Sequence, residues 1–293
     1  MAVVSGKKGG PTVWVNASIH GDEYLGTAAI ARLLPSLEPE ALTGSLILTP
    51  VLNVPAFREM RRTNSHHDVD LNRAWAGGVH PGTTTRIRDE VASEILARAD
   101  VVIDLHSGGN RYLQGAFTVY HRVGGTVEER SCALAKACGL PLIWADGTEF
   151  LEGALITAAA KMGKPSALIE IAGEGKAEEH WVLRMVSAVR GALARAGVLR
   201  WEPDYLPEYR VFHEFSLVKN HREGLWERQV EPGEDVGKGD TLGRVLDPFG
   251  AEIEVVKSTE DANLLGIYTY GFVTEGETIA ELGHGFHKEG PPA

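Results

Sequence analysis

The chain has 293 residues, of which 43% are hydrophobic and 24% are charged. This composition is ordinary for a globular protein and excludes disordered, collagen-like and coiled-coil chains. There is no run of about 18 apolar residues for a membrane-spanning helix, and the first ten residues lack the apolar core of a secretory signal. We therefore expect a cytoplasmic protein. The only cysteines, Cys132 and Cys138, are too few for a disulfide framework.

The negative charge is unevenly distributed along the chain. The formal net charge is −11, and residues 201–293 hold 8 basic and 19 acidic side chains, so the whole excess lies in that segment. An acidic chain without a basic patch is not expected to bind nucleic acid or an anionic membrane. The change in charge near residue 200 is a first indication of a domain boundary.

The first two-thirds of the chain alternates apolar strand patterns with helical patterns. Strands are predicted over 12–16, 45–50, 101–105 and 167–171, and helices over 26–34, 84–98, 128–138 and 178–196. In the second helix, Ile87, Val91 and Ile95 are expected to face inward. This alternation predicts an α/β domain over residues 1–205, with a largely parallel mixed sheet and helices on both faces.

The pattern changes to short β-like runs separated by acidic and glycine-containing turns after residue 205. These runs lie at 211–217, 224–229, 242–246, 251–256, 263–269 and 278–282. They predict a small C-terminal β-sandwich or barrel domain over residues 206–293. We expect this domain to wall the active site or to mediate self-association into a homo-oligomer.

Candidate metal ligands follow the predicted strands. His20 and Glu23 come after the first strand, His106 directly follows the third and Glu170 lies in the fourth. Parallel strands present their carboxyl ends at one edge of a sheet, where ligands bind. Two histidines and one glutamate form a common ligand set for catalytic zinc, with a fourth position left for water. A single His-x-x-Glu pair is more often a surface turn, so the prediction rests on the joint placement of the residues.

A second polar cluster lies between residues 61 and 73 and contains Arg61, Arg62, Asn72 and Arg73. Arginine pairs bidentately with carboxylates, and an asparagine adds a directional amide. The cluster therefore favours an anionic ligand. The alternative is a solvated loop in which the arginines pair with Asp68 and Asp70.

Four linked segments resemble the succinylglutamate desuccinylase/aspartoacylase family of the zinc carboxypeptidase-like superfamily. They are His20-Gly-Asp-Glu23, Asp70-Leu-Asn-Arg73, Asp104-Leu-His106-Ser and Ile169-Glu170-Ile. The resemblance implies one Zn²⁺ bound by His20, Glu23 and His106, and Glu170 as the general base. It implies that Arg62, or its neighbour Arg61, polarises the scissile carbonyl, and that Asn72 and Arg73 bind a substrate carboxylate.

The sequence departs from this family at two places. Aspartoacylases carry a further arginine about ten residues before the catalytic glutamate, where this chain has Ala160 and Lys161. An N-acyl-aspartate substrate, which needs a second carboxylate clamp, is therefore not favoured. The His-Gly-Asp-Glu turn also comes after only 19 residues, fewer than is usual in the family, so an N-terminal edge strand is expected to be missing or the start to be misplaced.

These observations predict a zinc-dependent amidohydrolase that cleaves the amide bond of a small anionic N-acyl amino acid. The alternative is a metallocarboxypeptidase that trims peptides, for which we expect an open groove in place of a closed pocket. Two less favoured alternatives are that the chain is a non-catalytic binding protein or a carrier-type module. The second is suggested by Lys257, whose setting faintly resembles the lysine hairpin of lipoyl domains.

Overall fold

A central sheet of 13 strands organises the computed structural model, which describes residues 1–292. Its first strands are β1 (Ala2–Ser5), β2 (Lys8–Ala17), β3 (Thr43–Thr49), β4 (Val101–His106), β5 (Tyr112–His121), β6 (Leu142–Asp146) and β7 (Ser166–Gly173). The order β1-β3-β2-β4-β7-β5 includes parallel pairs β3–β2, β2–β4 and β4–β7, whereas β1 and β5 join antiparallel. The predicted mixed, largely parallel sheet is thus confirmed.

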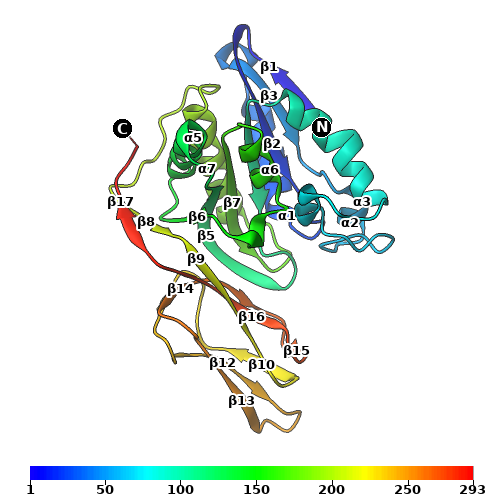
Figure 1. The fold of residues 1–293 in the computed structure, drawn as a ribbon, viewed down its shortest axis with the longest axis vertical. Helices are drawn as coiled ribbons and strands as arrows, with labels where there is room; N and C mark the ends of the chain where they lie inside the picture. The colour runs from blue at the N-terminus through cyan, green and yellow to red at the C-terminus, as the bar shows by residue number, and fades with distance from the viewer. Residues whose placement is uncertain (293) are drawn as a thin grey trace.

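Helices cover both faces of this part of the sheet (Figure 1). One face packs against α1 (Tyr24–Leu33), α5 (Gly125–Ala137) and α7 (Glu179–Arg195). The other packs against α4 (Ser93–Arg98) and α6 (Leu155–Lys161). The remaining helices are α2 (Val54–Arg58) and α3 (Thr83–Arg86), with short helical turns at Leu34–Ser36, Pro39–Ala41, Leu71–Ala76 and Glu149–Leu151. None of the helices within residues 1–292 is long and apolar enough to cross a membrane.

The predicted helix over 84–98 is interrupted by a π-helical segment, Ile87–Ala92, between α3 and α4. A π-helix bonds residue i to i+5 and so places more residues in each turn than an α-helix does. The residues of this segment that face the core therefore do not follow the three- and four-residue spacing of an α-helix. Val91 is 47% exposed, which contradicts the expectation that it faces inward, whereas Ile95 is buried as expected.

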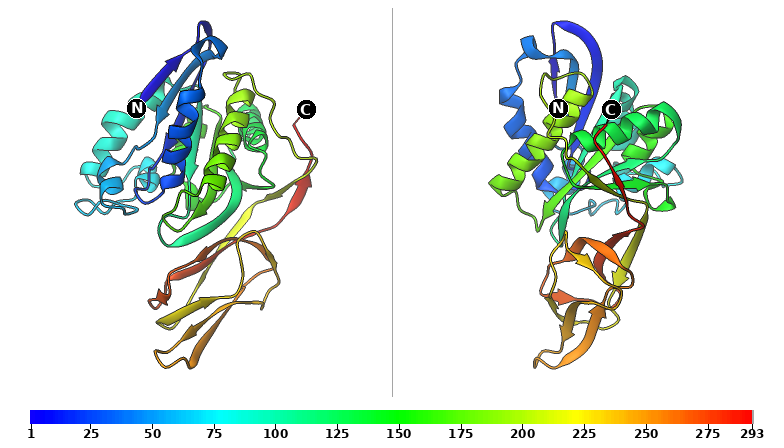
Figure 2. Two further views of the ribbon diagram at one scale, coloured as in Figure 1. Left: turned by 180° about the vertical axis from the view of Figure 1, so that it is seen from behind. Right: turned by 90° about the vertical axis from the view of Figure 1, so that its left-hand side faces the viewer.

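The C-terminal region is rich in antiparallel strands and continues the central sheet (Figures 1 and 2). Strands β14 (Ala262–Tyr268), β16 (Thr278–His284) and β9 (Glu214–Lys219) extend it from β5, while β8 (Tyr209–Phe212) pairs with β6. A second sheet has the order β13-β12-β10-β15, with bounds Glu252–Lys257, Thr241–Leu246, Gly224–Arg228 and Phe272–Val273. Short strands β11 (Asp235–Val236) and β17 (His287–Glu289) pair with β14 and β8. The domain boundary predicted at residue 205 stays a prediction.

The carboxyl ends of β2, β4 and β7 meet at one edge of the sheet. Asn16 is in register with Asp104, and His106 with Glu170. Helix α1 approaches this edge closely at Gly26, where a Cβ would lie 2.8 Å from the Cβ of Leu105. The absence of a side chain there lets the beginning of α1 pack against the strand ends.

Candidate active site

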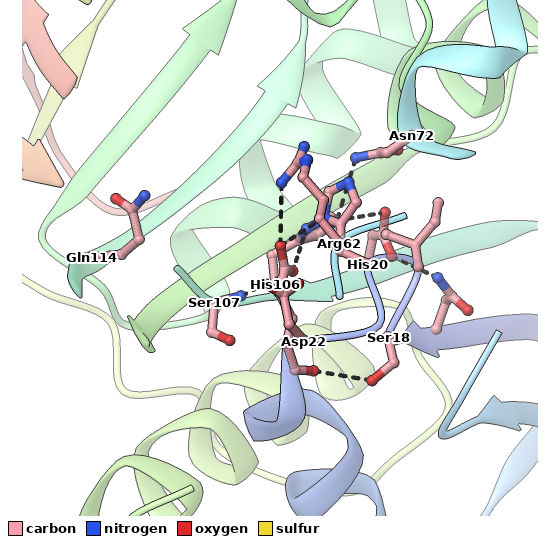
Figure 3. Close-up of polar contacts among 12 residues, drawn as sticks. Ser18, His20, Asp22, Arg62, Asn72, His106, Ser107 and Gln114 are labelled. Carbon is pink, nitrogen blue, oxygen red and sulfur yellow. Dashed lines mark hydrogen bonds and ion pairs between the residues drawn. The ribbon is translucent and has the colours of Figure 1, made fainter. Parts of the chain in front are cut away.

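His20, Glu23 and His106 form a buried cluster at this edge (Figure 3). The two Nδ1 atoms both point to the Glu23 carboxylate: that of His20 lies 2.6 Å from Oε1, and that of His106 lies 2.9 Å from Oε2. The imidazole ring centroids are 5.1 Å apart. One potential ligand atom from each residue lies within 4.8 Å of the others, so the three could hold a single metal ion.

Two aspartates fix the orientation of the imidazoles. Asp70 Oδ1 lies 3.1 Å from Nε2 of His20, and Asp104 Oδ2 lies 3.0 Å from Nε2 of His106. Asp104 is fully buried and also accepts a hydrogen bond from the Asn16 amide at 2.8 Å. Histidine ligands commonly engage a carboxylate through the nitrogen that does not face the metal, which fixes the tautomer and ring orientation.

The donor set fits a divalent metal of the zinc type. Two imidazole nitrogens and one carboxylate are a typical three-ligand set of catalytic zinc sites. The second nitrogen of each imidazole has a carboxylate partner, so both Nδ1 atoms remain for the metal. The three residues predicted to bind the metal therefore lie close together, and both Nδ1 atoms face the Glu23 carboxylate.

Glu170 lies beside this cluster on β7 and faces the same cavity. Its Oε1 atom is buried and has no hydrogen-bond partner in residues 1–292. Burial, together with the nearby charge of Glu23, raises the pKa of Glu170 well above its usual value. An unpartnered buried carboxyl oxygen with a raised pKa is typical of a group that takes part in proton transfer.

Arg62, and not its neighbour Arg61, contacts the cluster. Its Nη2 donates to Asp70 Oδ2 at 2.8 Å, and its Nη1 lies 3.6 Å from Glu23 Oε1. Asp70 thus bridges Arg62 and His20. Arg61 is exposed and also lines the outer part of the cavity.

Asn72 and Arg73 lie on the 3₁₀ turn Leu71–Ala76 and also line the cavity. The Asn72 carbonyl accepts a hydrogen bond from the backbone of Leu155 at 2.9 Å, and its amide nitrogen lies 3.5 Å from His106 Nε2. Arg73 donates to the Asn72 backbone carbonyl and lies 4.9 Å from the centroid of the Phe150 ring. Among residues 1–292, no carboxylate forms an ion pair with Arg73, so its guanidinium can receive an anion.

These side chains line one cavity of about 620 Å³. Its apolar lining residues include Phe117, Trp144 and Leu168 on strands of the sheet, and Phe150 in the Glu149–Leu151 turn. Further lining residues, Phe215, Leu217, Thr278 and Glu281, come from the C-terminal region. Strands from both parts of the chain therefore build the walls of a pocket.

An α/β fold with a His/Glu/His cluster at the edge of its sheet is typical of a metal-dependent hydrolase. Residues 9–196 match the model of the succinylglutamate desuccinylase/aspartoacylase catalytic domain. The chain belongs to this family, which confirms the resemblance found in the sequence and makes the protein an amide-bond hydrolase of the deacylase type.

Individual relatives resemble the chain over nearly its whole length. An N-alpha-acetyl-L-2,4-diaminobutyric acid deacetylase from Halomonas elongata is 28% identical over 280 residues, covering 93% of this chain and 82% of the relative. The product-bound structure of the ectoine utilization protein EutE (DoeB) from Ruegeria pomeroyi has a TM-score of 0.86 and 28% identity, covering 96% and 87% of the two chains. A succinylglutamate desuccinylase structure from a Silicibacter species has a TM-score of 0.84 at 28% identity, with the same coverage.

Several residues of the site were not found by sequence reasoning. Asp70 was considered only as a partner of arginine, although its place in the Asp-Leu-Asn-Arg segment was a usable signal. Gln114 and Glu281 carry no motif, and no local pattern places them in the cavity. Gln114 lies on β5, and Glu281 reaches the cavity because β14 and β16 extend the sheet from β5.

Proposed function

We propose that the protein is a zinc-dependent deacylase that hydrolyses the amide bond of a small N-acyl amino acid. The observation that carries this proposal is the cluster of His20, Glu23 and His106 with Glu170 beside it in one cavity. When bound by these three ligands, zinc supplies a Lewis acid that activates water and polarises an amide carbonyl.

Side chains of the protein carry out proton transfer and charge stabilisation. Glu170 accepts a proton from the attacking water and delivers it to the leaving nitrogen as the carbon–nitrogen bond breaks. The products are a carboxylate and a free amine. Arg62 lies 3.6 Å from Glu23, so its guanidinium is placed to stabilise the negative charge that develops on the carbonyl oxygen.

Asn72 and Arg73 bind the amino-acid part of the substrate. Arg73 has no carboxylate partner among the described residues, so it can pair with the α-carboxylate of the substrate, next to the Asn72 amide. Where aspartoacylases carry their further arginine, this chain has Ala160, which is buried in α6, and Lys161, which pairs with Glu152. The proposed substrate therefore bears one carboxylate on its amino-acid part.

The shape of the site supports a small substrate and not a peptide. Residues of the C-terminal region line the same cavity as the metal cluster, so both parts of the chain form its walls. A peptide-trimming enzyme would need an open groove along which the chain extends. We therefore favour a small N-acyl amino acid over the alternative of a peptide trimmed by a metallocarboxypeptidase.

A substrate panel tests this proposal. The zinc-loaded protein is incubated with N-acetyl, N-succinyl and N-formyl derivatives of several amino acids, and the released amine is quantified. We expect turnover of at least one acyl class, loss of turnover after chelation and recovery when zinc is restored. Hydrolysis of peptides but of no N-acyl amino acid would contradict the proposal.

A further inference from the structure

The cavity continues inward from the catalytic groups along one face of the central sheet. Glu170 on β7 is in register with Phe117 on β5, and Leu168 is in register with Val119. Leu168 and Glu170 are two residues apart on one strand, so their side chains point to the same face, and both line the cavity. Because β7 runs toward the catalytic edge, Leu168 lies about 7 Å further from this edge than Glu170 does. The cavity therefore extends past Glu170 toward the interior of the protein.

Three aromatic side chains pack together beside Leu168 and Val119. Trp144 is in register with Val119, and its ring stacks on that of Phe215 with the centroids 4.6 Å apart. Phe150 packs against Phe215 with a centroid separation of 4.8 Å. We use the term inner compartment for the part of the cavity lined by Val119, Trp144, Phe150, Leu151, Leu168 and Phe215.

The inner compartment is apolar, and its walls keep some accessible surface. Leu168 and Trp144 are 5% and 4% exposed although they lie on interior strands, and Phe150 is 39% exposed. None of the six side chains carries a charge. The one polar side-chain atom among them, Trp144 Nε1, is buried and has no hydrogen-bond partner in residues 1–292. The side chains of the inner compartment therefore offer a ligand apolar contact and no hydrogen bond.

Arg73 lies at the border of the inner compartment, with its guanidinium 4.9 Å from the centroid of the Phe150 ring. Since the proposed function assigns the α-carboxylate of the substrate to Arg73, this carboxylate is held next to the compartment. The side chain of an amino acid branches from the same carbon as the carboxylate, whereas the acyl group is separated from that carbon by the amide nitrogen. The side chain is therefore the part of the substrate that is placed to enter the inner compartment.

We propose that the inner compartment binds a large apolar side chain, which makes the preferred substrates N-acyl derivatives of amino acids such as leucine, methionine and phenylalanine. This inference rests on the proposed function. Removing a side chain of this size from water strengthens binding by about 10- to 100-fold. A polar side chain would lose its hydration there without gaining a hydrogen bond. The expected preference differs from that of the Halomonas deacetylase, whose substrate carries an amino group on its side chain.

The test compares substrates whose side chains have nearly the same shape but differ in polarity. N-acetyl-L-leucine ends in two methyl groups, and N-acetyl-L-asparagine has an amide in their place. We expect the zinc-loaded protein to favour the leucine derivative by about tenfold or more in kcat/KM. If both derivatives are hydrolysed and the asparagine derivative is equal or better, the inference is overturned while the proposed deacylase function stands.

Leu168→Phe tests the place of the side chain by filling the inner compartment. We expect the ratio of kcat/KM for N-acetyl-L-leucine to that for N-acetyl-L-alanine to fall by about tenfold, because the larger side chain no longer fits. Leu183→Phe is the matched control: Leu183 is 49% exposed on α7 and does not line the cavity. The control should keep the ratio within about twofold. A folded Leu168→Phe protein with the wild-type ratio would contradict the assignment.

A longer acyl group tests the other way in which a substrate could fill the compartment. N-hexanoyl-L-alanine and N-acetyl-L-alanine share the amino acid and differ only in the acyl chain. We expect the longer chain to raise kcat/KM by less than about twofold. A tenfold gain for the hexanoyl substrate, without a preference for leucine over asparagine, would assign the inner compartment to the acyl group and overturn the inference.

Binding of the deacylated products gives a readout that does not require catalysis. Calorimetric titration of the zinc-loaded protein should show tighter binding of L-leucine than of L-asparagine, and this comparison decides the proposal even if Leu168→Phe does not fold. If no acetylated substrate is hydrolysed but leucine binds selectively, the deacylase function fails and the apolar site stands. Equal binding of the two amino acids would overturn the apolar site.

Discussion

Asp70 Oδ1 lies 3.1 Å from His20 Nε2, while Oδ2 of the same carboxylate accepts two hydrogen bonds from Arg62. One aspartate thus couples a metal ligand to the arginine assigned to the developing negative charge. His20 and Arg62 together hold the pKa of Asp70 well below its usual range, against the effect of its partial burial. This relationship links metal binding to the orientation of the arginine.

Asp70→Asn is therefore expected to weaken the metal site without removing a ligand. Loss of a carboxylate that orients a histidine ligand typically lowers metal affinity or activity by about 10- to 100-fold. Zinc affinity is measured by competition with a chelator. Asp68→Asn, an exposed position whose partner is Thr63, is the matched control and should keep the parental affinity. Equal affinities of the two variants would show that Asp70 does not support the metal.

His106→Ala should abolish stoichiometric metal binding. The wild-type protein is expected to carry about one zinc per chain, and a site with only two protein ligands retains the ion poorly. Metal content is measured by inductively coupled plasma mass spectrometry after dialysis. His180 is exposed and remote from the cluster, so His180→Ala should retain the metal. Unchanged zinc content in His106→Ala would refute the ligand assignment.

Glu170→Gln separates catalysis from metal binding. The amide has nearly the shape of the carboxylate but cannot accept the proton of water, so kcat should fall by about 100-fold or more. Zinc content and melting temperature should remain near those of the parent, because the Glu170 side chain has no ion-pair partner within residues 1–292. Near-parental turnover would exclude Glu170 as the general base.

Arg73→Ala tests recognition of the α-carboxylate. Removing a charge-assisted bidentate pair should raise KM for N-acyl amino acids by about 10- to 100-fold. Arg73→Lys should recover only part of this loss, since lysine lacks the planar fork of donors. The decisive comparison is a carboxylate-free N-acyl amine. An equal loss on that substrate would mean that Arg73 is structural, through its contact with Phe150.

The shared location of His20, Glu23, His106 and Glu170 could be predicted from the sequence because these residues lie in or directly after apolar strands. His106 and Glu170 are in register on the neighbouring strands β4 and β7, and the parallel arrangement brings them to one edge of the sheet. The place of Glu281 in the cavity could not be predicted in this way. It depends on the register of three antiparallel strands, β5, β14 and β16, that come from distant parts of the sequence. The outward side chain of Val91 was missed for a local reason, since a π-helical segment breaks α-helical spacing.

The joining of β5 to β14 has a consequence for how this protein can change over evolutionary time. The groups assigned to bond cleavage all come from residues before 171, whereas Phe215, Leu217 and Glu281 in the cavity wall come from strands after residue 205. Substitutions in the later strands can therefore alter which molecules fit while the hydrolytic centre stays intact. The two parts of the chain can therefore accumulate substitutions with different effects, those after residue 205 acting on the cavity wall and those before residue 171 acting on the metal cluster and Glu170.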